Sequence, residues 1–202
     1  MNNIDYSNYK QKIQSRSFLK FLIGILPRFY NHFCAEINRK VAQLNGASIG
    51  KNTYITFRLA LKSNKNLIVG NSTIIETSNL DLRDKITIGN HVIINKNATI
   101  IRASHEVDSK DFETISNPLL VNDFVWIATN AAVLPSCKKI ANGAVIGAFS
   151  VLTKSILDEK VIFAGNPANL IRKRENVYSN LVLESLQGRD FHKYIKFRNN
   201  KL

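Results

Sequence analysis

The chain has 202 residues, of which 45% are hydrophobic and 21% charged, and its formal net charge is +13. This length and composition exclude a disordered chain and favour one domain that buries a sizeable core. The basic charge comes without a helix-turn-helix, zinc-finger or RNP signature, so the sequence does not favour a nucleic-acid-binding protein.

Residues 1–45 are expected to form a helical flank. The opening is polar and has no apolar core of a secretory signal. The most apolar stretch, residues 18–27, contains Lys20 and ends at Pro27, which is too short to cross a bilayer. We therefore expect a cytoplasmic protein.

Much of the positive charge lies at the two ends of the chain. Residues 1–46 hold seven lysines and arginines against two acids, and residues 172–202 hold eight against three. In the segment of residues 16–33, cations alternate with Phe, Leu and Ile. Two roles for this segment stay open: capping the end of a repeat array, or peripheral contact with the inner membrane face through anionic lipids.

From Ile49 onward an aliphatic residue recurs every six positions, which fits neither a helix nor a simple alternating strand. The repeat positions are Ile49, Ile55, Val69, Ile75, Ile88, Ile94, Ile100, Val121, Ile127, Val133, Ile140, Ile146 and Leu152. A β-sandwich would show irregular spacing of about 8–12 residues. Short β-branched segments between turn residues instead favour a parallel β-helix with three hexapeptides per coil.

Corners and breaks complete the pattern. Glycines are expected at tight corners, where the missing Cβ relieves strain; they are Gly50, Gly70, Gly89, Gly143 and Gly147. The spacing from Ile75 to Ile88 is one residue longer than two repeats, and the spacing from Val133 to Ile140 is one residue longer than one repeat. The largest break is the excursion of residues 103–120. A loop of this length that leaves a regular coil is typical of a functional site.

The run "VWIATNAAVLPSCKKIANGAVIGAFSVLTKSILDEKVIFAGNPANLIRKR" resembles the signature end of the hexapeptide-repeat acyltransferases. Its pattern is most similar to sugar O-acetyltransferases of the maltose/galactoside type and their capsular-polysaccharide relatives. The resemblance implies an all-β, left-handed parallel β-helix over residues 46–171. A helical flank over 1–45 and a basic helical tail over 172–202 are expected on either side of it. It also implies a homotrimer with acetyl-CoA in the groove between neighbouring coils.

The same resemblance assigns a role to His105, which lies sixteen residues after Gly89. It implies that this side chain is the general base that removes a proton from the acceptor hydroxyl. The residue type suits that chemistry, because an imidazole can take and return a proton near neutral pH. Glu106 and Asp108 are candidates to orient the ring or to contact the acceptor, with plain exposure to solvent as the alternative.

The residues that the resemblance places along the acetyl-CoA groove are Trp126, Ala128, Thr129, Ala148, Thr153, Lys154 and Arg172. Arg172 matches a cation near the phosphate end of the coenzyme, and Trp126 either shields the site or packs at the edge of the core. Ala128, Phe149 and Ser136 stand where the family usually has glycine. By ungapped count the family's sugar-binding asparagine falls on Ile75, which leaves Asn79 or Thr77 as nearby candidates.

The sequence therefore predicts an acetyl-CoA-dependent O-acetyltransferase that acts on a saccharide hydroxyl in surface or capsular polysaccharide biosynthesis. N-acetylation of an amino sugar, O-acetylation of serine or an antibiotic, and a noncatalytic β-helix scaffold stay open as alternatives. No metal is expected. A zinc hydrase on this fold would need three histidines, and the coil region holds only His91 and His105.

Overall fold

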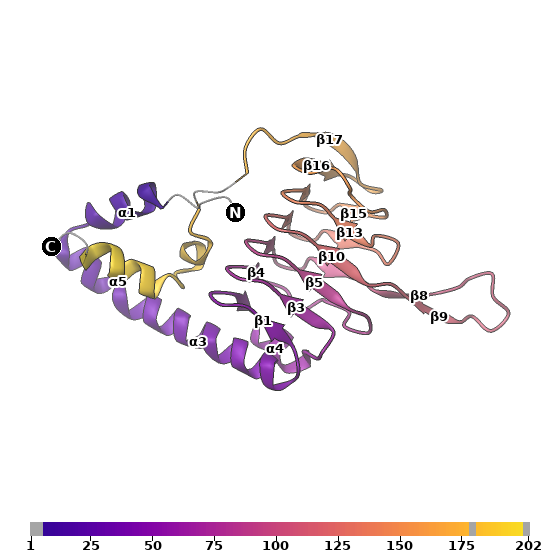
Figure 1. Ribbon diagram of the computed structural model, residues 1–202, viewed down its shortest axis with the longest axis horizontal. Coiled ribbons are helices and arrows are strands. Elements are labelled where there is room, and N and C mark those ends of the chain that lie inside the picture. The colour runs from indigo at the N-terminus through magenta and orange to yellow at the C-terminus, as the bar shows by residue number, and fades with distance from the viewer. Residues whose placement is uncertain (1–5, 178–180, 200–202) are drawn as a thin grey trace. The chain divides into compact units, whose positions relative to one another are not determined.

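A computed structural model describes residues 6–177 and 181–199 (Figure 1). The chain divides into two compact units, residues 1–37 with 178–202, and residues 38–177. The sequence-based boundaries lie at residues 45 and 171. The long helix α3 (Ile25–Leu44) contributes to both units.

The unit of residues 38–177 is a solenoid in which short strands stack on three faces. The first face contains β1 (Ser48–Ile49), β3 (Leu67–Val69), β5 (Ile86–Ile88), β10 (Leu119–Val121) and β13 (Lys139–Ile140). The second face contains β2 (Tyr54–Ile55), β4 (Ile74–Ile75), β6 (Ile93–Ile94), β11 (Trp126–Ile127), β14 (Val145–Ile146), β16 (Val161–Ala164) and β17 (Asn169–Lys173). The third face contains β7 (Thr99–Ile100), β12 (Ala132–Val133) and β15 (Val151–Leu152). The strands of these three faces pair in parallel except β17, which is antiparallel to β16. This confirms the predicted parallel β-helix.

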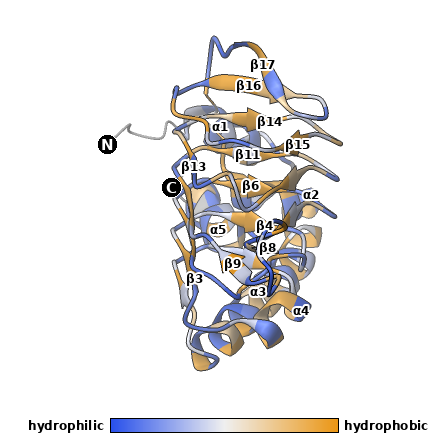
Figure 2. Ribbon diagram, turned by 90° about the vertical axis from the view of Figure 1, so that its right-hand side faces the viewer, coloured by the Kyte–Doolittle hydropathy of each residue, from blue (hydrophilic) through white to orange (hydrophobic). Residues whose placement is uncertain are grey.

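The repeat residues form the core because their register places each one directly over its counterpart in the next coil. On the second face, Ile55 pairs with Ile75, Ile75 with Ile94, and Ile94 with Ile127, and all four are fully buried. Figure 2 shows the strands of this face lying one above another. Continuous stacking of this kind buries apolar surface that no single coil could cover alone.

The corners of the coils adopt a left-handed backbone at the fourth residue of the hexapeptide. Residues with positive φ at this position are Asn52, Ser72, His91, Asn97, Phe124, Asn130, Gly143 and Phe149. Of the predicted corner glycines, Gly143 therefore has the strained conformation for which glycine is suited, with φ of 65°. Gly70 has another reason. A Cβ there would lie 2.7 Å from the carbonyl carbon of Gly89 in the next coil, so its missing side chain permits close stacking.

Side-chain amides and carboxylates link the corners of successive coils. The backbone N–H of Asn71 donates to Oδ1 of Asn90 at 2.8 Å, and that of Asn90 donates to Oδ1 of Asp123 at 2.7 Å. The N–H of Asp123 donates in turn to Oδ1 of Asn142 at 3.1 Å. This ladder satisfies corner donors that have left the strand pairing.

The end of α3 covers the open end of the solenoid. Asn38 donates from Nδ2 to the carbonyl of Ile55 at 2.9 Å, and Ala42 is buried in the solenoid core. The third side of the first coil is occupied by α4 (Phe57–Lys62), whose first turn is capped by the hydroxyl of Thr56. Capping of the solenoid was one of two roles left open for residues 16–33. In the structure, residues 38–44 cap this end.

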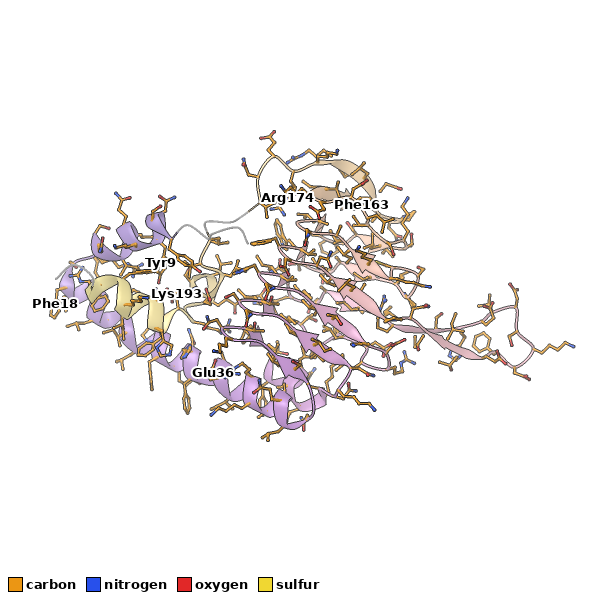
Figure 3. The ribbon with its side chains drawn as sticks, viewed as in Figure 1. Tyr9, Phe18, Glu36, Phe163, Arg174 and Lys193 are labelled. Carbon is orange, nitrogen blue, oxygen red and sulfur yellow. The ribbon has the colours of Figure 1, made fainter. Side chains whose placement is uncertain are left out.

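The other unit is helical and has its own small core. It contains α1 (Ser7–Gln14), α2 (Phe18–Ile23), the first part of α3, the 3-10 helix η1 (Leu183–Gln187) and α5 (Phe191–Asn199). Buried Tyr194 stacks on Phe21 with ring centres 4.8 Å apart, and Arg28 lies between that tyrosine ring and Asp190. Figure 3 shows Phe18 at the end of this unit. The predicted helical flank and helical tail are confirmed.

We expect Gly70→Ala to lower the free energy of unfolding by about 1–3 kcal/mol, because the added Cβ overpacks the space between two coils. The matched control is Ala141→Gly, at the equivalent position of a coil that already accommodates a Cβ, which should cost about 0.5–1 kcal/mol. Urea denaturation measures both. Wild-type stability of the Gly70 variant would show that this contact does not set the coil spacing.

Candidate active site

The predicted excursion is a β-hairpin. Strand β8 (Ala103–His105) follows β7 and pairs antiparallel with β9 (Thr114–Ser116), and His105 lies opposite Thr114. The hairpin projects from the stacked coils (Figure 1), and the chain rejoins the first face at β10. His105 is thereby carried outside the solenoid and is exposed.

The orientation of His105 is set by Phe112, in the loop of the hairpin. Nδ1 of the imidazole lies 2.8 Å from the carbonyl oxygen of Phe112, and the two rings stack 4.5 Å apart with 7° between their planes. A carbonyl oxygen only accepts, so Nδ1 carries the proton and Nε2 presents its lone pair. Sequence reasoning missed Phe112, although an aromatic residue within a polar excursion was a signal.

The two acidic neighbours of His105 do not orient it. Glu106 and Asp108 are exposed, and neither carboxylate is hydrogen-bonded to the imidazole in the described part of the chain. The backbone N–H of Glu106 donates to the carbonyl of Glu113 at 2.9 Å, which extends the pairing of the hairpin. The orienting contact is therefore a main-chain carbonyl.

Asn79 lies one coil below the strand that leads into the hairpin. Its carbonyl accepts the N–H of Ile100 in β7 at 2.9 Å, and its side chain is exposed. Thr77 is buried, and its hydroxyl accepts the N–H of Asn79 at 3.1 Å. Of the two candidates near Ile75, Asn79 is the one whose side chain reaches solvent.

Trp126 lies on the outside of the second face. Its side chain is 40% exposed, and Nε1 donates to Oδ1 of Asn95 at 2.6 Å. Asn95 donates from Nδ2 to Glu76 at 2.9 Å, so three consecutive coils contribute to one polar chain. The tryptophan is thus a fixed surface residue and not a core residue. The sequence offered no direct signal for its partners.

Five of the seven residues expected along the coenzyme groove flank the third face. Ala128 and Thr129 form one corner, and Phe149, beside Ala148, stacks above it through an N–H that donates to the carbonyl of Thr129 at 3.1 Å. Thr153 and Lys154 follow β15 at the other edge of this face. Apart from half-buried Thr153 and buried Ala128, these side chains are exposed.

Arg172 is separate from those corners. It is exposed on β17, the last strand of the second face, where it pairs with Ile162. Figure 3 shows Arg174, whose guanidinium donates to the carbonyl of Gly143 at 2.7 Å, near this strand. The last strand of the second face and the residues after it therefore carry basic side chains.

Two departures from the family pattern have visible consequences. Phe149 is 73% exposed, with φ of 58°, so an aromatic ring stands beside Ala148 where the family has a bare backbone. Ser136 donates from its hydroxyl to the carbonyl of Thr153 at 2.6 Å, which ties the corner before Lys154 to the coil below.

Other nucleophilic chemistry finds little support. Cys137 is buried, and burial raises the pKa of its thiol to about 11, a rise that Arg102 opposes. It is therefore protonated at neutral pH. Within residues 6–177 and 181–199, no three His, Cys, Asp or Glu side chains gather into a metal-binding group.

No family profile matches the chain. It is 34% identical over 133 residues to the "Putative colanic acid biosynthesis acetyltransferase WcaF" of Escherichia coli (strain K12), which covers 65% of this chain and 72% of the relative. It is 29% identical over 155 residues to the galactoside O-acetyltransferase of the same strain, over 74% and 69% of the two chains.

A solved structure has the same fold. The hexapeptide-repeat-containing acetyltransferase of Vibrio cholerae O1 biovar eltor, complexed with acetyl coenzyme A, superposes with a TM-score of 0.57 at 21% identity, over 85% of this chain and 86% of that one. This superposition, the three-faced solenoid and the 34% sequence identity to WcaF together confirm the left-handed β-helix. The chain belongs to the hexapeptide-repeat acetyltransferase family.

Proposed function

We propose that this protein transfers the acetyl group of acetyl-CoA to a hydroxyl of a saccharide, as a step in surface polysaccharide biosynthesis. The observation that carries the proposal is the imidazole of His105, which Phe112 holds with Nε2 free on an exposed hairpin. The names of WcaF and of the galactoside O-acetyltransferase support a sugar acceptor.

His105 acts as the general base of this reaction. Its Nε2 accepts the proton of the acceptor hydroxyl while the hydroxyl oxygen attacks the thioester carbonyl. When the tetrahedral intermediate collapses, the carbon–sulfur bond breaks and the imidazolium returns the proton to the coenzyme A sulfur. The carbonyl of Phe112 keeps Nδ1 protonated throughout, so a single tautomer serves both steps.

The donor binds along the third face and its corners. Thr129 and Ala148 are exposed at two stacked corners and are the contacts that we assign to the pantetheine arm, with buried Ala128 beside Thr129. Lys154 and Arg172 supply cations for the phosphates. Thr153 lines the groove, and Trp126 shields it from the second face. Asn79 is the candidate contact to the acceptor, and exposed Glu106 and Asp108 are further candidates on the hairpin.

We expect His105→Ala to lower the rate of acetyl transfer by roughly 100-fold or more, because a general base is lost. The rate is measured as release of the coenzyme A thiol. Saccharides, amino sugars, serine and chloramphenicol are each tested as acceptors, and the one that gives the fastest release identifies the acceptor class. Affinity for coenzyme A, measured by calorimetry, should be unchanged. Near-wild-type turnover in this variant would contradict the mechanism.

Two further variants serve as controls for that measurement. His192→Ala removes an imidazole from the helical unit and should keep full activity. Lys154→Ala should raise the KM for acetyl-CoA and leave kcat nearly unchanged, because it weakens binding equally in the ground and transition states. An unchanged KM would show that Lys154 lies outside the donor site.

We further propose that the protein is a homotrimer, because a groove along the third face is open until a neighbouring subunit covers it. The mass of one chain is 22.8 kDa, so sedimentation equilibrium should give about 68 kDa. A monomer that retains full transfer activity would refute this assembly.

Residues 16–33 are proposed to contact an anionic membrane surface. No helix in the described residues combines the length and the hydrophobicity that a membrane span requires. The helical unit nevertheless exposes a series of large apolar side chains, which are Phe18, Leu19, Leu22, Ile23, Leu26, Phe29, Tyr30 and Phe33. Lys20 is exposed among them, whereas Arg28 is used inside the unit by Asp190. Such a surface suits the headgroup region of a bilayer.

We expect the full chain to float with vesicles that contain anionic lipid, more strongly at low than at high salt. The double variant Leu19→Glu with Leu26→Glu should abolish flotation, because two apolar contacts with the bilayer become negative charges. These residues are 68% and 75% exposed, so the unit should still fold. Leu157→Glu, at an exposed leucine of the solenoid, is the matched control. Equal flotation of the double variant and the control would show that this surface does not bind membranes.

A further inference from the structure

The β8–β9 hairpin that carries His105 joins the solenoid through a narrow root. At the root, the N–H of Asn117 donates to the carbonyl of Arg102 at 3.0 Å. Beyond this point β8 and β9 form a separate two-stranded sheet. A two-stranded hairpin is only marginally stable by itself. The direction in which it projects therefore depends on what holds its root.

From the coil below, Asp81 holds the first residues of the hairpin. Its Oδ2 accepts the backbone N–H groups of Arg102 and Ala103, both at 3.1 Å. Arg83 binds the same carboxylate with Nε and Nη2, each at 2.8 Å. This pairing with Arg83, supported by the backbone N–H donors, holds the pKa of Asp81 well below its usual range. Asp81 is therefore a charged acceptor at neutral pH.

The side chain of Arg102 ties the same root to the coil above. It is fully buried, with 0% of its surface exposed. Its Nη1 donates to the carbonyl of Cys137 at 2.8 Å, and its Nη2 donates to the carbonyl of Leu134. Nη1 also lies 3.4 Å from the carbonyl of Asn117, the residue that follows the returning strand β9. One guanidinium thus links both strands of the hairpin to the next coil.

The charge of Arg102 has no ion-pair partner. Among the described residues, no carboxylate lies within ion-pair distance of its guanidinium, and Nε has no hydrogen-bond partner. Burial lowers its pKa accordingly. A buried cation held by carbonyl dipoles, on which Asp81 and Asp84 act only by longer-range attraction, is less favourable than an aliphatic side chain of similar volume. This points to a role beyond filling the corner.

We propose that Arg102 and Asp81 are positioning residues for His105, which clamp the hairpin root between two coils and fix where the imidazole is presented. The inference rests on the proposed role of His105 as the base. His105 lies three residues beyond Arg102, and a displacement of about 1 Å at a catalytic group can cost about 100-fold in rate. The clamp supplies rigidity that the hairpin lacks.

The test compares Arg102→Met and Asp81→Asn with Arg58→Met, which removes an exposed arginine of α4. We expect the first two variants to lower kcat by about 10–100-fold while the KM for acetyl-CoA changes by less than about 2-fold. Arg102→Lys should recover part of the loss. Arg58→Met should match the wild type. If Arg102→Met does not fold, Asp81→Asn carries the comparison, and wild-type kcat in that variant would overturn the proposal.

A double-mutant cycle with His105→Ala separates positioning from general destabilisation. If the clamp acts through His105, Asp81→Asn and Arg102→Met should cause no further loss of the residual transfer in the His105→Ala background. An undiminished loss in that background would show that these residues support the enzyme in some other way.

Hydrogen exchange gives a readout that does not depend on activity. In both variants the amides of residues 103–116 should exchange faster, while those of residues 139–152, two coils beyond β7, keep their protection. Unchanged exchange in the hairpin would refute the clamp even if transfer is detected. If the hairpin exchanges faster in the variants but the wild-type protein transfers no acetyl group, the clamp is upheld and the proposed function is refuted.

Discussion

The in-register stacking of one aliphatic residue upon another is the interaction on which the rest of the structure depends. Each coil is too small to bury its own apolar face, so its stability comes from the coils above and below. Stacking at strand spacing brings main chains together at the corners. This explains both the missing side chain at Gly70 and the amide ladder through Asn90.

The site is built where this regularity is interrupted. The chain leaves the third face after β7, and the groups that would have continued the coil find other partners. Asp81 takes the N–H groups of Arg102 and Ala103, and the Arg102 side chain takes carbonyls of the next coil. The proposed base therefore lies exposed on a projecting hairpin, while the root of that hairpin is hydrogen-bonded to the coils on either side.

The core of the helical unit is built from different side chains than the core of the solenoid. The helical unit has an aromatic and cationic core, centred on Tyr194, Phe21 and Arg28, and a large share of its apolar side chains faces outward. The solenoid, by contrast, buries all thirteen of its aliphatic repeat residues. The exposed apolar surface of the helical unit is the observation on which the proposed membrane contact rests.

The sequence by itself determined the solenoid, because a six-residue period has only one structural solution and needs no knowledge of distant contacts. It also placed His105 on an excursion, since a broken period is visible locally. The partners of His105 were decided by tertiary structure. The carbonyl of Phe112 is identified only when the hairpin folds back, and no side-chain pattern records a main-chain acceptor. The clamp at Arg102 was hidden for the same reason: its donors meet carbonyls 32 and 35 residues away, which become neighbours only after the coils have stacked.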